Sequence, residues 1–240
     1  MVIQTDLFLE EILAVPTFVV KNPIKIDVIQ FTPTGRKSFL YTKIDCSNHM
    51  DLRHLENLGF RVIEINVTLK QELGLKFKIG SNQNQQYRIR LAKADDRKDV
   101  EEIARKSFTL DRFHQDPRID NSSADEIKKQ WAGNFFLGKR GDLLVVATRN
   151  NRPVAFLLLL FGQKENIIDL IAVDSEHRKN GLAEQMIEFV KSIMESQKTL
   201  LVGTQATNIP SIRLYEKMGF QKIDSQILLH YHGPFESSNS

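Results

Sequence analysis

The chain contains 240 residues, and 41% of them are hydrophobic, which is enough for one large or two small domains with a substantial core. Its formal net charge of +3 is too small to indicate a nucleic-acid partner. The most apolar stretch, residues 155–161, is far too short to cross a membrane, and no secretory signal precedes it. The single cysteine, Cys46, cannot form an internal disulfide. We therefore expect a soluble cytoplasmic protein with neither a membrane nor a nucleic-acid partner.

The N-terminal part of the chain predicts a small domain built from strands and one helix. The expected strands are residues 18–20, 24–31, 38–44 and 61–69, and the expected helix is 50–58. The last of these strands alternates between polar and apolar positions, and Glu64 lies on its polar face. We predict an α+β accessory domain at residues 1–80, followed by a polar linker at residues 81–86.

The remainder of the chain predicts a larger domain that mixes strands and helices. The expected strands are residues 87–91, 143–148, 153–161 and 167–173, and a helix carries Val100, Ile103 and Ala104 on one face. Residues 149–152, with two adjacent asparagines, predict a hairpin turn. We place this domain at residues 86–232 and expect a flexible tail at residues 233–240.

Residues 169–187 predict a buried strand, a basic turn and an amphipathic helix. The turn consists of Arg178, Lys179, Asn180, Gly181, Leu182 and Ala183. The start of a helix presents backbone N–H groups without intrahelical partners and a partial positive charge, which suits a pyrophosphate. Gly181 allows the backbone to approach a ligand closely, and Ala183 keeps the first helical turn narrow. The alternative interpretation is a solvated helix entry with no ligand.

A second pattern follows in residues 200–220. Residues 200–204 form an apolar run that is too short for a helix and predicts a strand. Pro210 suits the first turn of a helix that carries Tyr215 and ends at Gly219. Asn208 stands directly before this helix, where an asparagine favours a helix cap or a turn.

These two patterns resemble the signatures of the GNAT superfamily of N-acetyltransferases. The first is R-x-x-G-x-A at residues 178–183, and the second is N-x-x-[AS]-x-x-x-Y-x-x-x-G-F at residues 208–220. The resemblance implies an α+β fold with a mixed, mostly antiparallel central sheet flanked by helices, and acetyl-CoA as co-substrate. It also implies that two central strands splay apart, so that one of them pairs with the pantetheine arm. The implied contacts are Ile171, Ala172, Val173, Asn208, Ser211 and Tyr215, together with the basic turn.

Tyr215 stands where the superfamily places its general acid. In the implied reaction an amine attacks the thioester carbonyl, and the departing thiolate benefits from a proton donor. A phenol with a reference pKa of about 10 is protonated at neutral pH and can supply that proton. A backbone N–H near Ile171 or Ala172 is the expected oxyanion donor. The alternative for Tyr215 is a packing role, with its ring buried and its hydroxyl solvated.

Three further segments are similar to TDP-fucosamine acetyltransferases of bacterial surface-polysaccharide synthesis. They are residues 58–69, which are like L-G-F-x-x-V-E-x-x-V-x-L with Ile63 at the first valine, residues 107–117 (ending R-F-H-x-D-P) with Trp131 and Asn134, and residues 202–208 (V-x-T-Q-x-x-N). This resemblance implies a nucleotide-linked 4-amino-4,6-dideoxy sugar as acceptor, and it suggests a homodimer. Asp111 departs from the pattern, which often has a small residue there.

Arg112, His114 and Asp116 are the candidate acceptor-binding residues. An arginine fork suits a diphosphate, and a histidine can relay a proton. The alternative is a packed loop in which Arg112 and Asp116 pair with each other. Trp131 is expected in the core rather than as a ligand platform.

The proton acceptor for the incoming amine is harder to assign from sequence. Glu64 fits the resembled segment, but an exposed strand carboxylate is the commoner case, and water could carry the proton because α-amino groups titrate near pH 8. We predict no metal site, because the histidines and the cysteine lack a ligand spacing. His230 and His232 alternate on a terminal strand, which is insufficient by itself.

Two alternative functions stay open at this point. The first is a GNAT enzyme that acts on another amine, such as a protein N-terminus, an amino acid or a polyamine. The second is a module that holds acyl-CoA without turnover. The retained turn at residues 178–183, Asn208 and Tyr215 argue against the second alternative, because a binding module could lose them freely.

Overall fold

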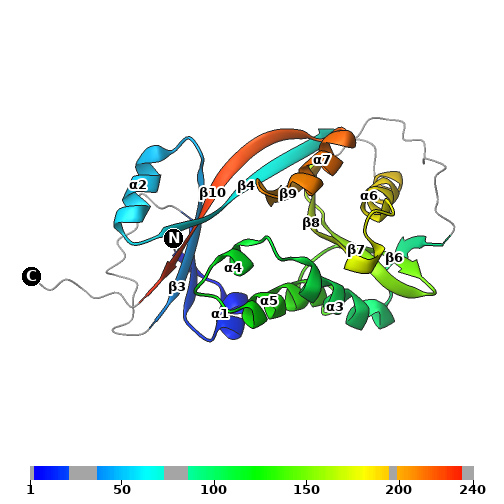
Figure 1. Ribbon diagram of the computed structural model, residues 1–240, viewed down its shortest axis with the longest axis horizontal. Helices are drawn as coiled ribbons and strands as arrows, with labels where there is room; N and C mark the ends of the chain where they lie inside the picture. Colours follow the sequence, from blue (N-terminus) through cyan, green and yellow to red (C-terminus); the bar gives the residue numbers. More distant parts are fainter. Residues whose placement is uncertain (1–2, 22–36, 73–85, 195–198, 234–240) are drawn as a thin grey trace, which may run out of the picture.

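Ten strands form one mixed sheet. The computed structural model describes residues 3–21, 37–72, 86–194 and 199–233 (Figure 1). The strands are β1 (Ile3–Thr5), β2 (Thr17–Val20), β3 (Phe39–Asp45), β4 (Arg61–Glu72), β5 (Arg88–Leu91), β6 (Leu143–Arg149), β7 (Arg152–Leu160), β8 (Glu165–Val173), β9 (Thr199–Gln205) and β10 (Gln221–His232). Their order is β1-β2-β3-β10-β4-β9-β8-β7-β6-β5, and only β2 with β3 and β8 with β9 are parallel neighbours. The expected mixed, mostly antiparallel sheet is confirmed.

Helices cover both faces of this sheet. They are α1 (Leu7–Leu13), α2 (His49–Asn57), α3 (Arg97–Ser107), α4 (Arg112–Gln115), α5 (Asn121–Gly133), α6 (Leu182–Ile193) and α7 (Ile209–Lys217), with short 3-10 turns η3 (Ala94–Asp96) and η4 (Ser175–His177). The helices α2, α6 and α7 lie on one face, and α1, α3, α4 and α5 lie on the other (Figure 1). The sheet is therefore the middle of three layers.

Successive side chains of β10 contact the helix layers on opposite faces of the sheet. Ile227, Leu229 and Tyr231 pack in the same core as Leu55 of α2. His230, which points to the opposite face, lies with its ring centroid 4.7 Å from that of Phe39. This follows from the period of two in a strand, which sends successive side chains to opposite faces.

The sheet crosses the predicted boundary between residues 80 and 86. The strand β4 pairs with β10 on one side and with β9 on the other, so the N-terminal strands share hydrogen bonds with the C-terminal ones. The strand β1 and the helix α1 were not predicted. The expected strand at 24–31, most of the linker at 81–86 and all but the first residue of the tail at 233–240 lie outside the described residues. The division into domains stays a prediction.

The hairpin predicted at residues 149–152 is confirmed. The strands β6 and β7 pair in antiparallel fashion down to Arg149 opposite Arg152. Asn150 and Asn151 have φ angles of 50° and 64°. Two consecutive left-handed residues are what a type I′ turn requires, and asparagine tolerates that conformation well.

The strands β8 and β9 separate partway along their length. Their parallel register runs from Glu165 opposite Thr199 to Ile168 opposite Val202 and ends there. Beyond that point β8 still pairs with β7, as far as Val173 opposite Ala155. Residues 169–173 therefore have no strand partner on the β9 side within the described part of the chain. In the same part, no helix is long and apolar enough to span a membrane.

Candidate active site

A cavity of about 650 Å³ lies where β8 and β9 have separated, and we call it the first cavity. It is bounded by the end of β8, the start of α6, the end of β9, the first turns of α7 and the connection between α3 and α4. The sequence-predicted residues that line it are Ile171, Ala172, Val173, Arg178, Lys179, Gly181, Leu182, Ala183, Asn208, Ser211 and Tyr215. The structure thus brings together nearly all of the residues expected to hold acetyl-CoA.

The turn before α6 has the backbone that an anion site needs. Gly181 has φ 71° and occupies the N-cap position of α6, where no side chain caps the helix. Lys179 also has a left-handed φ of 64°. Alternating left-handed and right-handed residues turn successive N–H groups toward one side and form a concave anion site. The first N–H groups of α6 therefore lack a side-chain acceptor at the edge of the first cavity.

Arg178 and Asn180 shape this turn from within. The guanidinium Nε of Arg178 donates to the carbonyl of Val173 at 3.2 Å. The side-chain amide of Asn180 donates to the carbonyls of His177 and Arg178. Asn180 does not line the first cavity, so its side chain fixes the loop rather than facing the space for a ligand.

Tyr215 is buried, with 3% of its surface exposed, and its ring lies 5.5 Å from that of Phe220. Burial raises the pKa of Tyr215 above its usual value, because the low-dielectric surroundings disfavour the phenolate. The phenol therefore keeps its proton at neutral pH. The ring packs in the core, as the alternative from the sequence expected, and the residue also lines the first cavity. Its role as general acid stays a prediction.

Asn208 caps the helix α7. Its side-chain oxygen accepts a hydrogen bond from the backbone N–H of Ser211 at 3.3 Å, and Pro210 stands in the first turn, as predicted. Asn208 also lines the first cavity. The cap sets the direction in which this amide side chain points, and its contact with pantetheine stays a prediction.

Residues 107–111 and Gln205 also line the first cavity, although the sequence did not single them out as site residues. Both fall inside segments that carried the resemblance to sugar acetyltransferases. The sequence motifs that contain these residues therefore indicated a family of enzymes, but they did not indicate that the residues line the cavity.

Glu64 and Arg112 meet on the opposite face of the sheet from α6 and α7. The Arg112 guanidinium lies 4.0 Å from the ring centre of Tyr41 and 4.4 Å from that of Phe113. Its Nη1 and the Oε2 of Glu64 are both buried without a hydrogen-bond partner among the described residues. Burial raises the pKa of Glu64, although the charge of Arg112 opposes that shift. The two side chains interact electrostatically with each other, and Arg112 also hydrogen-bonds Tyr41. The one buried atom of each that has no hydrogen bond indicates a place where a polar ligand can bind.

A second cavity of about 900 Å³ opens beside Arg112. Tyr41 and Lys43 of β3, Trp131 of α5 and Arg140 line it with Arg112. The indole N–H of Trp131 donates to Asp169 at 2.8 Å, and Arg140 forms an ion pair with the same carboxylate at 2.6 Å. Trp131 is half-buried and packs against two hydrophobic cores, as expected, and it also forms part of the cavity wall.

His114 and Asp116 line neither of these two cavities. The imidazole of His114 bonds to Asp111 at 2.7 Å and to Asp125 at 3.1 Å. The hydrogen bond with Asp111 raises the pKa of His114. These contacts make His114 part of the loop structure.

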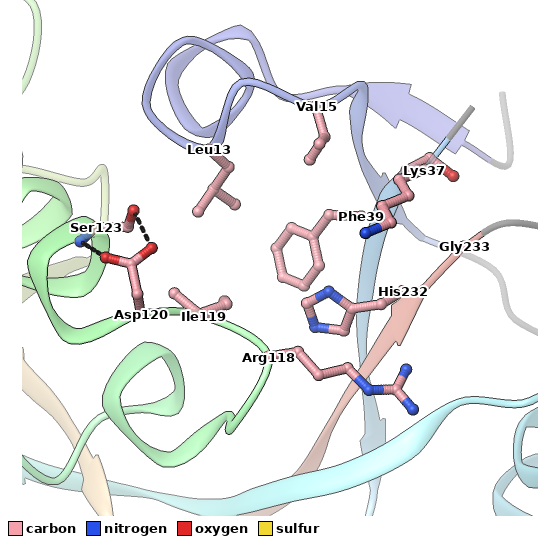
Figure 2. A pocket seen from close by; sticks show the side chains of 11 residues that line it. Leu13, Val15, Lys37, Phe39, Arg118, Ile119, Asp120, Ser123, His232 and Gly233 are labelled. Carbon is pink, nitrogen blue, oxygen red and sulfur yellow. Dashed lines mark hydrogen bonds between the residues drawn. The ribbon is translucent and has the colours of Figure 1, made fainter.

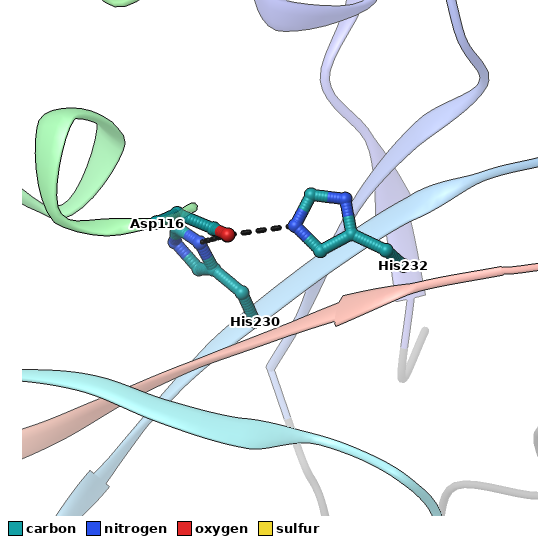
Figure 3. Close-up of side chains that lie close together, drawn as sticks. All are labelled: Asp116, His230 and His232. Carbon is teal, nitrogen blue, oxygen red and sulfur yellow. Dashed lines mark hydrogen bonds and ion pairs between the residues drawn. The ribbon is translucent and has the colours of Figure 1, made fainter. Parts of the chain in front are cut away.

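Asp116 does not pair with Arg112, as one alternative from the sequence supposed. Its Oδ2 lies 2.7 Å from Nδ1 of His230 and 2.7 Å from Nε2 of His232 (Figure 3). Burial alone would raise the pKa of Asp116, but hydrogen bonds from the two histidines outweigh it and hold the pKa well below its usual range. Burial lowers the pKa of His230 to about 4. The sequence placed the two histidines on one strand but could not show that a carboxylate joins them.

Comparisons with known proteins define the class. The family model described as acetyltransferase (GNAT) family matches residues 98–220, just over half of the chain, and the chain belongs to this family. Acetyltransferases of this family use acetyl-CoA as co-substrate. The first cavity lies within the matched region. The uncapped start of α6 lies at its edge, and the side of β8 that is not paired with β9 lies beside it.

Two named proteins are similar to parts of this chain. The chain is 36% identical over 133 residues to the spore coat polysaccharide biosynthesis protein SpsD of Bacillus subtilis, which covers 55% of this chain and 45% of the relative. It is 29% identical over 96 residues to the ribosomal protein bS18-alanine N-acetyltransferase of Salmonella typhimurium, which covers 38% of this chain and 65% of the relative. The chain thus matches less than two thirds of the length of either protein.

Solved structures share the fold. A GCN5-related N-acetyltransferase from Sphaerobacter thermophilus aligns over 99% of this chain and 78% of its own, with a TM-score of 0.60 and 12% identity. A functionally unknown conserved protein from Staphylococcus epidermidis aligns over 80% of this chain and 71% of its own, with a TM-score of 0.61 and 15% identity. At such identities the similarity concerns the fold alone.

Proposed function

We propose that this enzyme transfers the acetyl group of acetyl-CoA to the 4-amino group of a nucleotide-linked 4-amino-4,6-dideoxy sugar used in surface-polysaccharide synthesis. The observation that carries the proposal is Arg112, whose buried Nη1 has no hydrogen-bond partner among the described residues, at the wall of the second cavity. A planar guanidinium with a free donor suits a diphosphate. The similarity to SpsD, a polysaccharide biosynthesis protein, points to the same class of acceptor.

The charges around Arg112 agree with an anionic acceptor that carries an amine. Lys43 and Arg140 line the same second cavity as Arg112, although Arg140 is paired with Asp169. Six basic and four acidic side chains line this cavity in all, so basic residues are in excess there. Glu64, whose Oε2 is also unpartnered in the described structure, is coupled electrostatically to Arg112 and to Asp111, which lines the first cavity. Glu64 itself lines neither the first nor the second cavity. In the proposal, Arg112 binds the diphosphate and Glu64 is the proton acceptor behind it.

In the proposed reaction, acetyl-CoA binds in the first cavity, and Arg112 and Glu64 act from the face of the sheet opposite α6 and α7. The turn at residues 178–183 holds the pyrophosphate of acetyl-CoA, and the free backbone of residues 171–173 aligns the pantetheine arm. The acceptor amine attacks the thioester carbonyl, and a backbone N–H of Ile171 or Ala172 stabilises the oxyanion. Tyr215 protonates the departing thiolate of coenzyme A. Glu64 receives the proton that the amine loses, directly or through water, and its raised pKa strengthens it as a base.

The test measures release of free coenzyme A thiol with a panel of acceptors. The panel contains dTDP-linked 4-amino-4,6-dideoxyhexoses, the corresponding free amino sugars, spermidine, free amino acids and a peptide with an N-terminal alanine. We expect turnover with the nucleotide sugar and a much higher KM for the free sugar, because the diphosphate contacts are missing. Equal KM values for the two sugars would contradict a diphosphate site at Arg112.

A second candidate acceptor is the amino terminus of a protein. The similarity to the bS18-alanine N-acetyltransferase favours it, because that relative acts on an alanine. The alanine peptide in the panel tests this candidate directly. If the enzyme acetylates the peptide but not the nucleotide sugar, the acceptor is a protein amino terminus and the proposed sugar acceptor is wrong.

A further inference from the structure

Asp116, His230 and His232 come from two segments that are far apart in the sequence. Asp116 stands in the connection between α4 and α5, and the histidines occupy alternate positions of β10. The period of a strand places residues 230 and 232 on one face, and that face turns toward Asp116 (Figure 3). One ligand atom from each residue lies within 4.8 Å of the other two.

The two imidazole nitrogens converge on one carboxylate oxygen. Both imidazoles approach the same carboxylate oxygen, Oδ2, at 2.7 Å each, although Asp116 has two oxygens. The other oxygen, Oδ1, accepts the backbone N–H of Arg118 at 3.0 Å and is thereby fixed. A carboxylate oriented by its second oxygen is typical of the shell around a metal ligand.

Most of this cluster is buried, but one of its side chains faces a cavity. Asp116 and His230 are buried, at 2% and 1% exposure, and Phe39 packs against both imidazole rings. His232 is partly exposed and lines a third cavity of about 510 Å³, together with Phe39, Arg118 and Ser38 (Figure 2). The Oγ of Ser38 is buried there without a partner among the described residues. A small ligand or water can therefore reach the cluster from the third cavity.

We propose that Asp116, His230 and His232 form a binding site for a divalent metal ion of the zinc class. The donor set of two imidazole nitrogens and one carboxylate oxygen suits zinc and its neighbours, whereas Mg²⁺ and Ca²⁺ prefer oxygen ligands. Three protein ligands leave a further coordination position for water or for an anionic group in the third cavity. The ion ties the connection before α5 to the end of β10. The ring of His230 lies 6.3 Å from that of Phe113, next to Arg112, but none of the three ligand residues lines the first or the second cavity.

The test is a zinc titration of the full chain after treatment with a chelator. Isothermal calorimetry should show about one equivalent of Zn²⁺ bound per chain, and Zn²⁺ should raise the melting temperature while Mg²⁺ does not. His232→Gln should weaken Zn²⁺ binding by at least about tenfold, because it removes a direct ligand. His54→Gln, on the exposed surface of α2, is the matched control and should bind Zn²⁺ normally.

Asp116→Asn gives a second variant of the same site and should also weaken Zn²⁺ binding. Acetyl-CoA affinity checks the folding of His232→Gln, which should keep the wild-type value. The absence of Zn²⁺ binding to the wild-type chain would overturn the proposal and leave a hydrogen-bonded cluster. Binding of unchanged affinity in both folded variants would place the metal elsewhere and overturn it equally.

Discussion

The first and second cavities are built in different ways. The first cavity draws most of its lining from residues 171–215, a continuous strand–turn–helix–strand–helix segment. The second cavity draws on Tyr41, Arg112, Trp131 and Arg140, which come from three separate parts of the chain. A ligand held by the backbone and by one helix start can be inferred from a local pattern. A ligand held by converging side chains can be inferred only after the chain has folded.

The largest expected effect concerns the chemistry at the first cavity. Tyr215→Phe should lower kcat by about 10²-fold or more, because the leaving thiolate loses its proton donor. The affinity for acetyl-CoA should stay close to normal, since the ring still packs against Phe220. Steady-state kinetics and calorimetry with acetyl-CoA measure the two quantities.

Tyr231→Phe is the matched control for this experiment. Tyr231 packs against Phe60 in the core next to α2, away from the first cavity. Its loss of a hydroxyl should leave kcat unchanged. A Tyr215→Phe enzyme with wild-type kcat would remove the general-acid role and leave only the packing role.

The next effect concerns the backbone site of the first cavity. Gly181→Val should weaken acetyl-CoA binding by roughly 10- to 100-fold, because a β-branched residue resists φ 71° and displaces the N–H groups that face the pyrophosphate. Gly138→Val is the matched control, because Gly138 also has a left-handed φ of 65° but does not line the first cavity. Calorimetry measures the affinity of each variant for acetyl-CoA. An equal loss of affinity in both variants would indicate backbone strain throughout the protein rather than damage to the binding site.

A smaller effect tests whether the second cavity holds the acceptor. Arg112→Ala should raise the KM for a nucleotide-sugar acceptor by about tenfold, the loss of one charge-assisted hydrogen bond, and should change the KM for acetyl-CoA much less. Lys139→Ala, a neighbouring cation at the edge of the same cavity, tests whether net charge alone explains the result. Equal changes in the two KM values of Arg112→Ala would count against acceptor recognition.

The smallest effect is a pH dependence of stability at Glu64. Burial raises the pKa of this carboxyl, so its protonated form is favoured in the folded state. That contribution is fully present below the unfolded pKa, about 4.3, and is lost as the pH rises through the raised folded value. Glu64→Gln imitates the neutral form at every pH. Its stability relative to the wild type should therefore improve between about pH 4 and pH 8.

Urea unfolding at both pH values measures this difference. Glu56→Gln on the exposed side of α2 is the control and should show no such trend. A constant difference between Glu64→Gln and the wild type across this range would show that Glu64 is not buried in the way described.

Local rules predicted much of the fold because they act over a few residues. The hairpin at Asn150 and Asn151 follows from the φ angles that asparagine tolerates, and the start of α7 follows from Pro210 and Asn208. The alternation of residues 61–69 predicted a strand, which is β4, but not the burial of its side chains, because Val67 is buried and Ile65 on the same face is exposed. The insertion of β4 between β10 and β9 could not be predicted in this way, because pairing between distant strands depends on the whole sheet.

The sequence by itself determined the family, the co-substrate and the two segments that surround the first cavity, because these depend on backbone conformation and short spacings. Only the tertiary structure decided which side chains converge from distant segments. It separated Asp116 from Arg112 and joined it to His230 and His232, and it left Arg112 and Glu64 with buried unpartnered atoms. The physical reason is that a strand fixes the face on which a side chain lies, whereas the packing of the layers fixes what that face meets.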